Sequence, residues 1–365
     1  MSIPWWWNEI PKNSKEDSFF TLNSNSFTLG EKVAELESEL AREFNFQSVV
    51  ACNSGTSALV ISLLLAGIGP GDEVLVPALT WIATAQAVLQ VGAKPVVVDV
   101  DEYTLCISPG LIEEKINSRS RAIIPVYFNG RTPSVDQIVE IAKKYELTII
   151  EDRCKAMGTT FASRGGADFA LTQCFSLGMI SYISVGYGGF IGLRDKDLAA
   201  KARQIRDHGM NRNPEKYVQI GGNFKISDFV AALGISQLKL VESRVLHTLN
   251  LLSVYEKVLG DSKKIFVDNR YSRHKDIPTY VDAILSKDID SEWFVSECRK
   301  SGIQVNPYHP SISNADYLDS ECCPVAESFT GRLIALPSGP GMTIENAKFA
   351  ASQIQNILRL QKYDL

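Results

Sequence analysis

The sequence lacks the cysteine spacing that builds zinc sites and disulfide frameworks. Its seven cysteines are odd in number and scattered, and no two of them are separated by two residues, at positions 52, 106, 154, 174, 298, 322 and 323. This pattern indicates neither a structural zinc site nor a disulfide-stabilised secreted domain. It predicts reduced thiols and therefore a cytoplasmic protein.

Long apolar runs and an excess of positive charge are also missing. No stretch is long and apolar enough to span a bilayer, and the N-terminus lacks the charged segment and apolar run of a secretory signal. The formal net charge is −5 and the sequence has no basic stripe. These features argue against nucleic acid or a membrane as the main partner.

The chain does contain enough apolar material for a large folded structure. Of its 365 residues, 45% are hydrophobic and 22% are charged, which is a normal globular balance. We expect a large domain over residues 1–245 and a smaller one over 246–365, because the length exceeds one average domain. Three consecutive tryptophans, Trp5 to Trp7, have two interpretations. An N-terminal arm that packs on a groove or a partner subunit is favoured over a ligand site.

Short β-branched runs alternate with helical patterns over the first part of the chain. Strands are predicted at residues 49–52, 73–77, 94–100, 122–127 and 147–152, with helices between them at 57–66, 85–91, 111–116 and 135–145. The alternation predicts an α/β fold with a mostly parallel central sheet covered by helices. Farther on we expect a loop at 210–219, one long helical region at 229–259 and a final helix at 344–358.

Two segments carry the strongest motifs. In residues 53–59 a small polar turn lies between a buried strand and a helix, which points backbone N–H groups and the helix dipole at an anion. Residues 174–190 follow the strand that ends at Asp152 and close on a glycine cluster. Together they resemble the cofactor site of the DegT/DnrJ/StrS family of nucleotide-sugar aminotransferases, which depend on pyridoxal 5'-phosphate (PLP).

The resemblance covers almost the whole chain, from Thr28 to Thr343. It implies the PLP fold of type I, with a large domain and a smaller C-terminal α/β domain, and a dimer in which both subunits contribute to each site. It also implies the residues that bind the cofactor phosphate, namely Gly55, Thr56, Ser57 and Ser176, with Asn223 reaching the phosphate of the neighbouring subunit. Trp81 would stack on the pyridine ring.

Asp152 ends a predicted strand, where α/β sheets place functional groups. The resemblance implies that it pairs with the pyridinium nitrogen, which keeps the ring protonated and makes it an electron sink. The alternative is an ordinary solvated aspartate at a strand end. The other matches around it favour the cofactor role.

The lysine that defines the family is missing. In the family it forms the Schiff base with the cofactor, and its position, counted from Ser176, is Ser181. A hydroxyl cannot hold the aldehyde and is a poor base without an activating neighbour. We therefore expect PLP or pyridoxamine 5'-phosphate (PMP) to be bound non-covalently.

A second departure is Lys155, which stands where the family has a glutamine hydrogen-bonded to the 3-oxygen of the cofactor. Three interpretations stay open. Lys155 is a charge partner of cofactor or substrate, which is favoured, or a surface lysine without a role, or a relocated Schiff-base lysine, since a desolvated amine can become nucleophilic.

The substrate loop of the C-terminal domain departs as well. The usual histidine position of the family is Ser313, while Tyr308 and His309 lie nearby in the sequence and are the candidate substrate residues. A structural and a catalytic role for His309 have equal weight.

Three functions follow from this pattern. The first is an enzyme that modifies a nucleotide-linked keto sugar, for a surface polysaccharide or a natural product. Its variant is a sugar 3-dehydratase that uses PMP, because residues 151–158 and 183–189 resemble that branch, although the branch has histidine at the position of Ser181. The second is a silent subunit that pairs with a lysine-bearing paralogue, and the third is a binding protein that keeps only the fold. We expect the first, as a homodimer.

Overall fold

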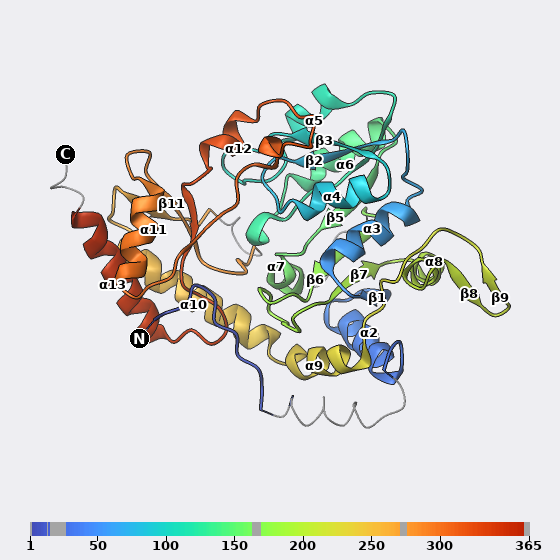
Figure 1. Ribbon diagram of the computed structural model, residues 1–365, viewed down its shortest axis with the longest axis horizontal. Coiled ribbons are helices and arrows are strands. Elements are labelled where there is room, and N and C mark those ends of the chain that lie inside the picture. The colour runs from blue at the N-terminus through green and yellow to red at the C-terminus, as the bar shows by residue number, and fades with distance from the viewer. Residues whose placement is uncertain (1, 13, 15–26, 163–168, 271–275, 361–365) are drawn as a thin grey trace.

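A seven-stranded sheet forms the centre of the computed structural model, which describes residues 2–12, 14, 27–162, 169–270 and 276–360 (Figure 1). In spatial order the strands are β1 Ser48–Cys52, β7 Gly189–Leu193, β6 Thr172–Ser176, β5 Thr148–Asp152, β4 Ser120–Ile123, β2 Glu73–Pro77 and β3 Lys94–Val98. The strands from β6 to β3 run parallel, whereas β7 is antiparallel to both of its neighbours. The predicted α/β fold with a mostly parallel sheet is confirmed.

Helices cover both faces of this sheet. One face packs on α3 Gly55–Leu65, α4 Ala83–Gln90 and α8 Lys196–Arg206. The other face packs on α5 Pro109–Lys115 and α6 Val135–Lys144 near β3, and on α2 Glu31–Glu43 and α9 Asp228–Leu238 near β1. The strands are therefore buried on both sides, which explains their continuous β-branched runs.

A second, smaller sheet organises the C-terminal part. Its four antiparallel strands follow the order β10 Ile265–Val267, β11 Asp282–Leu285, β13 Leu333–Ala335 and β12 Asn306–Pro307. Around it lie α10 Val241–Leu259, α11 Ser291–Lys300 and α13 Ile344–Leu360, which share one apolar core (Figure 1). The domain boundary predicted at 245/246 falls inside α10 and stays a prediction.

Short elements connect these parts. They are the helices α7 Met157–Ala162 and α12 Pro324–Ser328, and the 3₁₀ turns η1 Phe128–Gly130 and η2 Ile312–Asn314. None of the described helices combines the length and the apolarity that a membrane crossing needs.

Two predicted elements are wrong. The expected loop at 210–219 contains a hairpin of β8 Met210–Arg212 and β9 Glu215–Tyr217, which projects from the large part (Figure 1). Its strands are mostly polar, and only Met210 and Asn211 are half-buried, so no apolar alternation marks them. The expected single helix at 229–259 is interrupted between α9 and α10, where no proline or glycine gives a local signal.

The N-terminal tryptophans pack on the smaller sheet. Ile3 and Trp6 form bridges with Ile303 and Ser338, and Trp6 is buried. The ring of Trp5 meets Tyr280 edge-on, with 6.0 Å between the ring centroids. The arm is thus part of the folded C-terminal core, and it also brings Trp5 to the cavity described next.

Candidate active site

A cavity of about 450 Å³ opens where the carboxyl ends of the large sheet face the small domain. Its floor comes from the segments that follow β1, β2, β4, β5 and β6, and its other wall from the arm and the small sheet. Eight residues predicted from the sequence line it, namely Gly55, Thr56, Trp81, Asp152, Lys155, Ser176, Tyr308 and His309. This is the place where parallel α/β sheets bind ligands, and the volume suits a small organic molecule.

The first turn of α3 forms one end of the cavity. Ser54 caps the helix, because its Oγ accepts a hydrogen bond of 3.0 Å from the backbone N–H of Ser57. Ser54, Gly55 and Thr56 line the cavity together with Ser176 from the end of β6. The free N–H groups of this turn and the neighbouring hydroxyls make a site for an anion.

Two of the predicted phosphate ligands lie outside the lining. The hydroxyl of Ser57 donates a 2.6 Å hydrogen bond to Asn53 Oδ1 and serves the cap, while Ser54, which the sequence reasoning missed, faces the cavity. Asn223 lies on the surface, where its backbone oxygen accepts a hydrogen bond from Asn53. Its position leaves it available to a neighbouring molecule.

Glycine at 189 lets β7 approach this turn. A Cβ built on Gly189 would lie 2.5 Å from the carbonyl carbon and oxygen of Ser54 and 2.7 Å from the nitrogen of Gly55. All three are backbone atoms, so no side chain can rotate away. The shape of the anion-binding turn therefore depends on the absence of a side chain at this position.

We expect Gly189→Ala to destabilise the fold by about 1–3 kcal/mol, because an overpacked backbone contact must be relieved by shifting α3. The midpoint of urea unfolding measures this change. The matched control is Gly110→Ala in α5, where a Cβ meets nothing within 4 Å. Equal midpoints for the two variants would contradict the close contact.

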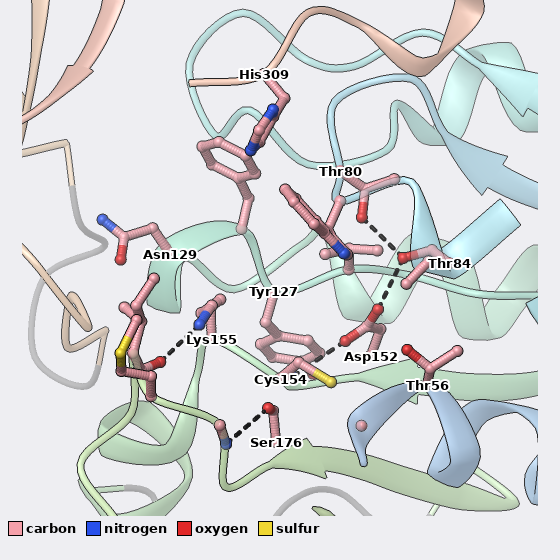
Figure 2. A pocket seen from close by; sticks show the side chains of 18 of the residues that line it. Thr56, Thr80, Thr84, Tyr127, Asn129, Asp152, Cys154, Lys155, Ser176 and His309 are labelled. Carbon is pink, nitrogen blue, oxygen red and sulfur yellow. Dashed lines mark hydrogen bonds between the residues drawn. The ribbon is translucent and has the colours of Figure 1, made fainter. Parts of the chain in front are cut away.

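Asp152 is held by a short chain of hydroxyls. Thr84 donates a 2.9 Å hydrogen bond to Asp152 Oδ2, and the hydroxyls of Thr80 and Thr84 are 2.9 Å apart (Figure 2). The other carboxylate oxygen accepts the backbone N–H of Cys154 at 3.1 Å. Asp152 is buried yet lines the cavity. Its carboxylate is thus fixed in one orientation, as a partner for a cationic group of a ligand must be.

Thr80 and Thr84 were not predicted as site residues. Thr84 lies in the first turn of α4 and Thr80 in the bend before it. Nothing in this local sequence reveals that Thr84 meets Asp152, which lies 68 residues farther along the chain. Asn129 was missed for the same reason. It lines the cavity, and its side chain holds the backbone of Tyr280, 151 residues away.

Lys155 enters the cavity from the turn after Asp152. Its Nζ donates a 2.6 Å hydrogen bond to the carbonyl oxygen of Ile180, and Figure 2 shows the side chain reaching toward that backbone. Burial lowers the pKa of Lys155 to about 8, although the nearby Cys154 and Asp152 act in the opposite direction. Lys155 therefore lines the cavity and does not face the outer surface, while its role stays a prediction.

Ser181 follows Ile180 but does not line the cavity. Its side chain is buried and donates a 3.1 Å hydrogen bond to the carbonyl oxygen of Ser176. Lys155 is the one lysine or arginine among the described residues that line the cavity. The amine of this site therefore comes from position 155.

Aromatic rings line the side of the cavity toward the small domain. Trp81 and His309 meet edge-on with 4.3 Å between their centroids, and Trp81 keeps 59% of its surface exposed. Tyr308 packs near Phe128 and donates a 3.2 Å hydrogen bond to Asp282 Oδ2. A flat ligand thus meets ring surfaces from both domains.

The comparisons with known proteins agree with this geometry. The model of the DegT/DnrJ/EryC1/StrS aminotransferase family matches residues 9–355. The chain belongs to this family. The resemblance stated from the sequence motifs is therefore confirmed.

Two curated relatives show the range of similarity within the family. The chain is 29% identical over 339 residues to the UDP-2-acetamido-2-deoxy-3-oxo-D-glucuronate aminotransferase of Pseudomonas aeruginosa, covering 92% of this chain and 93% of the relative. It is 36% identical over 234 residues to the GDP-perosamine synthase of Caulobacter vibrioides. That match covers 64% of this chain and spans 63% of the length of the relative.

A solved structure supports both fold and cofactor class. NtdA from Bacillus subtilis with bound cofactor PMP superposes with a TM-score of 0.85 at 26% identity, over 96% of this chain and 83% of the other. Similar aminotransferases superpose with TM-scores between 0.85 and 0.91. The fold is that of type I PLP enzymes, and the structural neighbours include PLP and PMP forms.

The residues of this cavity fit such a cofactor. At Gly55 a Cβ would lie 2.7 Å from Cys154 Sγ and 3.1 Å from Ser176 Cβ, so the turn leaves no room for a side chain beside the anion-binding end. Asp152 offers a fixed carboxylate and Trp81 an exposed ring. Anion site, carboxylate and aromatic face are the three features that a pyridine phosphate needs.

Proposed function

We propose that this protein binds PLP or PMP without a covalent bond and modifies a nucleotide-linked keto sugar. The observation that supports this proposal is a cavity that keeps the anion-binding turn, the fixed Asp152 and an aromatic face, while a buried serine occupies position 181.

Each of these cavity residues has a proposed role toward the cofactor. Gly55, Thr56 and Ser176 would bind the phosphate, with Ser54 completing the turn. Trp81 would cover the ring, and Asp152 would hold the proton on the ring nitrogen. The cofactor supplies an electron sink for the carbon being changed.

The substrate side is proposed from the small domain and from the names of the relatives. Tyr308 and His309 line the cavity opposite the anion-binding turn, where a sugar bound to the cofactor end would extend. Two relatives are named for GDP- and UDP-linked sugars. A nucleotide sugar is therefore the substrate class we propose, and a cytoplasmic location belongs to the same proposal.

A homodimer is part of this proposal. The exposed Asn223 lies at the base of the segment that carries the hairpin β8–β9, and Tyr217 and Ile220 near it keep 71% and 79% of their surface exposed. Such rings and aliphatic chains suit a protein interface better than water. A second copy would bring Asn223 to the phosphate end of its partner.

Loading the purified protein with PLP or PMP tests the proposal. We expect an absorbance band of bound cofactor that persists through gel filtration. We also expect an unchanged protein mass after borohydride treatment, because position 181 has no lysine whose imine with PLP could be reduced to a stable bond. A mass increase would contradict non-covalent binding, and peptide mapping would then locate the modified residue. A protein that retains neither cofactor would instead favour the silent-subunit function.

A further inference from the structure

We propose that Lys155 is the proton-transferring residue of this site, acting from position 155 in place of a lysine at position 181. The inference rests on the proposed function, since it needs the cofactor in the cavity. In this role, Nζ of Lys155 takes a proton from one carbon atom of the bound cofactor and substrate and returns it to another carbon atom.

Position is the first argument. Lys155 Nζ lies 2.6 Å from the carbonyl oxygen of Ile180, the residue directly before Ser181. The amine therefore reaches the same loop from which a lysine at position 181 would start. Ser181 itself directs its hydroxyl away, to the carbonyl of Ser176.

The second argument is that Asp152 and Cys154, the described cavity-lining residues closest to Lys155 in the sequence, are poor candidates for the base. Asp152 is engaged by Thr84 and by the N–H of Cys154, and it faces the ring nitrogen in the proposed function. Burial raises the pKa of the Cys154 thiol well above its usual value, so this group stays protonated. Asp152 is therefore committed to the ring nitrogen of the cofactor and Cys154 is protonated, so neither side chain serves as the base for a carbon atom of the reactants.

The remaining titratable groups of the lining come from other elements. They are the tyrosines and the histidine at Tyr127, Tyr187, Tyr280, Tyr308 and His309. Burial raises the pKa values of Tyr127 and Tyr280, which keeps their hydroxyls neutral. The ring of His309 is packed against Trp81. Lys155 is thus the group best placed to exchange a proton.

The ionisation of Lys155 suits this task. Burial lowers its pKa to about 8, so roughly a tenth of the molecules carry a neutral amine at pH 7. A base works best when its pKa lies near the working pH. The proton taken up by Nζ leaves again to the second carbon, so no other reactant is consumed.

The test is a single turnover of PMP-loaded protein with 2-oxoglutarate and other 2-oxo acids, followed by absorbance. We expect Lys155→Ala and Lys155→Arg to keep bound PMP but to react about 100- to 10,000-fold more slowly. Added ethylamine should restore part of the rate in Lys155→Ala, because the amine can occupy the space that the substitution opens. The matched control is Lys264→Ala, since Lys264 also donates to a backbone carbonyl but lies in the small domain.

A substrate-free measurement makes the test independent of the 2-oxo acid chosen. In the wild type the absorbance of bound cofactor should change with a midpoint near pH 8, and this midpoint should vanish in Lys155→Gln. A wild-type rate in Lys155→Arg, no rescue by ethylamine, or a midpoint that survives in Lys155→Gln would each overturn the role of Lys155. Failure of the wild type to bind PLP or PMP would instead overturn the proposed function.

Discussion

Replacing Asp152 by alanine is expected to lower the rate of any cofactor-dependent reaction about 100- to 1,000-fold. The carboxylate is buried at the end of β5 and fixed by Thr84 and the N–H of Cys154. It can therefore stabilise a protonated ring nitrogen without reorganising, and removal of a preorganised electrostatic partner typically has an effect of this size. The affinity for PMP, measured by absorbance titration, should fall as well.

Two further variants separate charge from structure. Asp152→Asn keeps the size of the side chain and an acceptor oxygen, so the fold should persist while the rate falls nearly as far. Thr84→Val keeps the shape of a buried side chain but removes the donor to Oδ2. The rate should then fall only about 5- to 10-fold, which corresponds to the loss of one hydrogen bond. Wild-type rate and affinity in Asp152→Asn would show that the ring nitrogen lies elsewhere.

Replacing Arg131 by methionine is expected to destabilise the protein by about 3 kcal/mol or more. Arg131 follows η1 in the large part, and its guanidinium lies 2.6 Å from Asp268 and 3.1 Å from Asp282 of the small domain. All three side chains are buried, with exposed fractions of 1%, 0% and 0%. Removing the cation leaves two carboxylates in a medium of low polarity, which is costly even though Arg270 still pairs with Asp268.

The pH dependence of this effect has a definite sign. Burial alone would raise the pKa of Asp268, but Arg131 and Arg270 outweigh it, and the pKa lies below its usual value. The stabilisation is therefore complete above the unfolded pKa of roughly 4 and is lost as the pH falls through the folded value. We expect the difference in stability between the wild type and Arg131→Met to shrink as the pH is lowered from 7 toward 3.

Urea unfolding monitored by circular dichroism measures both effects. The matched control is Arg42→Met, because Arg42 pairs with Glu39 on the surface and keeps 69% of its side chain exposed. That change should alter the free energy of unfolding by less than about 1 kcal/mol. If both arginine variants unfolded at the same midpoint, the buried cluster would not connect the two parts of the molecule as described.

Arg131 also reaches the active site indirectly. Asp282 accepts the hydroxyl of Tyr308, whose ring lines the cavity. The ion cluster therefore helps to place the substrate side of the site relative to the sheet.

The sequence determined those features that depend on neighbouring residues. Apolar β-branched runs predicted the parallel strands, and the polar turn before residue 57 predicted the start of α3, which lies two residues earlier at Gly55. Asp152 ends such a run, but it was the resemblance to the family that marked it as a cofactor residue. Where strands bury almost nothing, as in the hairpin β8–β9, the same reasoning had no pattern to detect.

Only the tertiary structure decided which side chains meet. The sequence left three interpretations of Lys155 open, and it named Ser57 where Ser54 faces the cavity. Lys155 meets a carbonyl 25 residues away, and Thr84 meets Asp152 over 68 residues. Such contacts arise when separate βα units pack side by side, so the direction of a side chain and its loss of water depend on distant segments. Strand, turn and helix follow from local periodicity, whereas the amine of this site and its lowered pKa follow from packing.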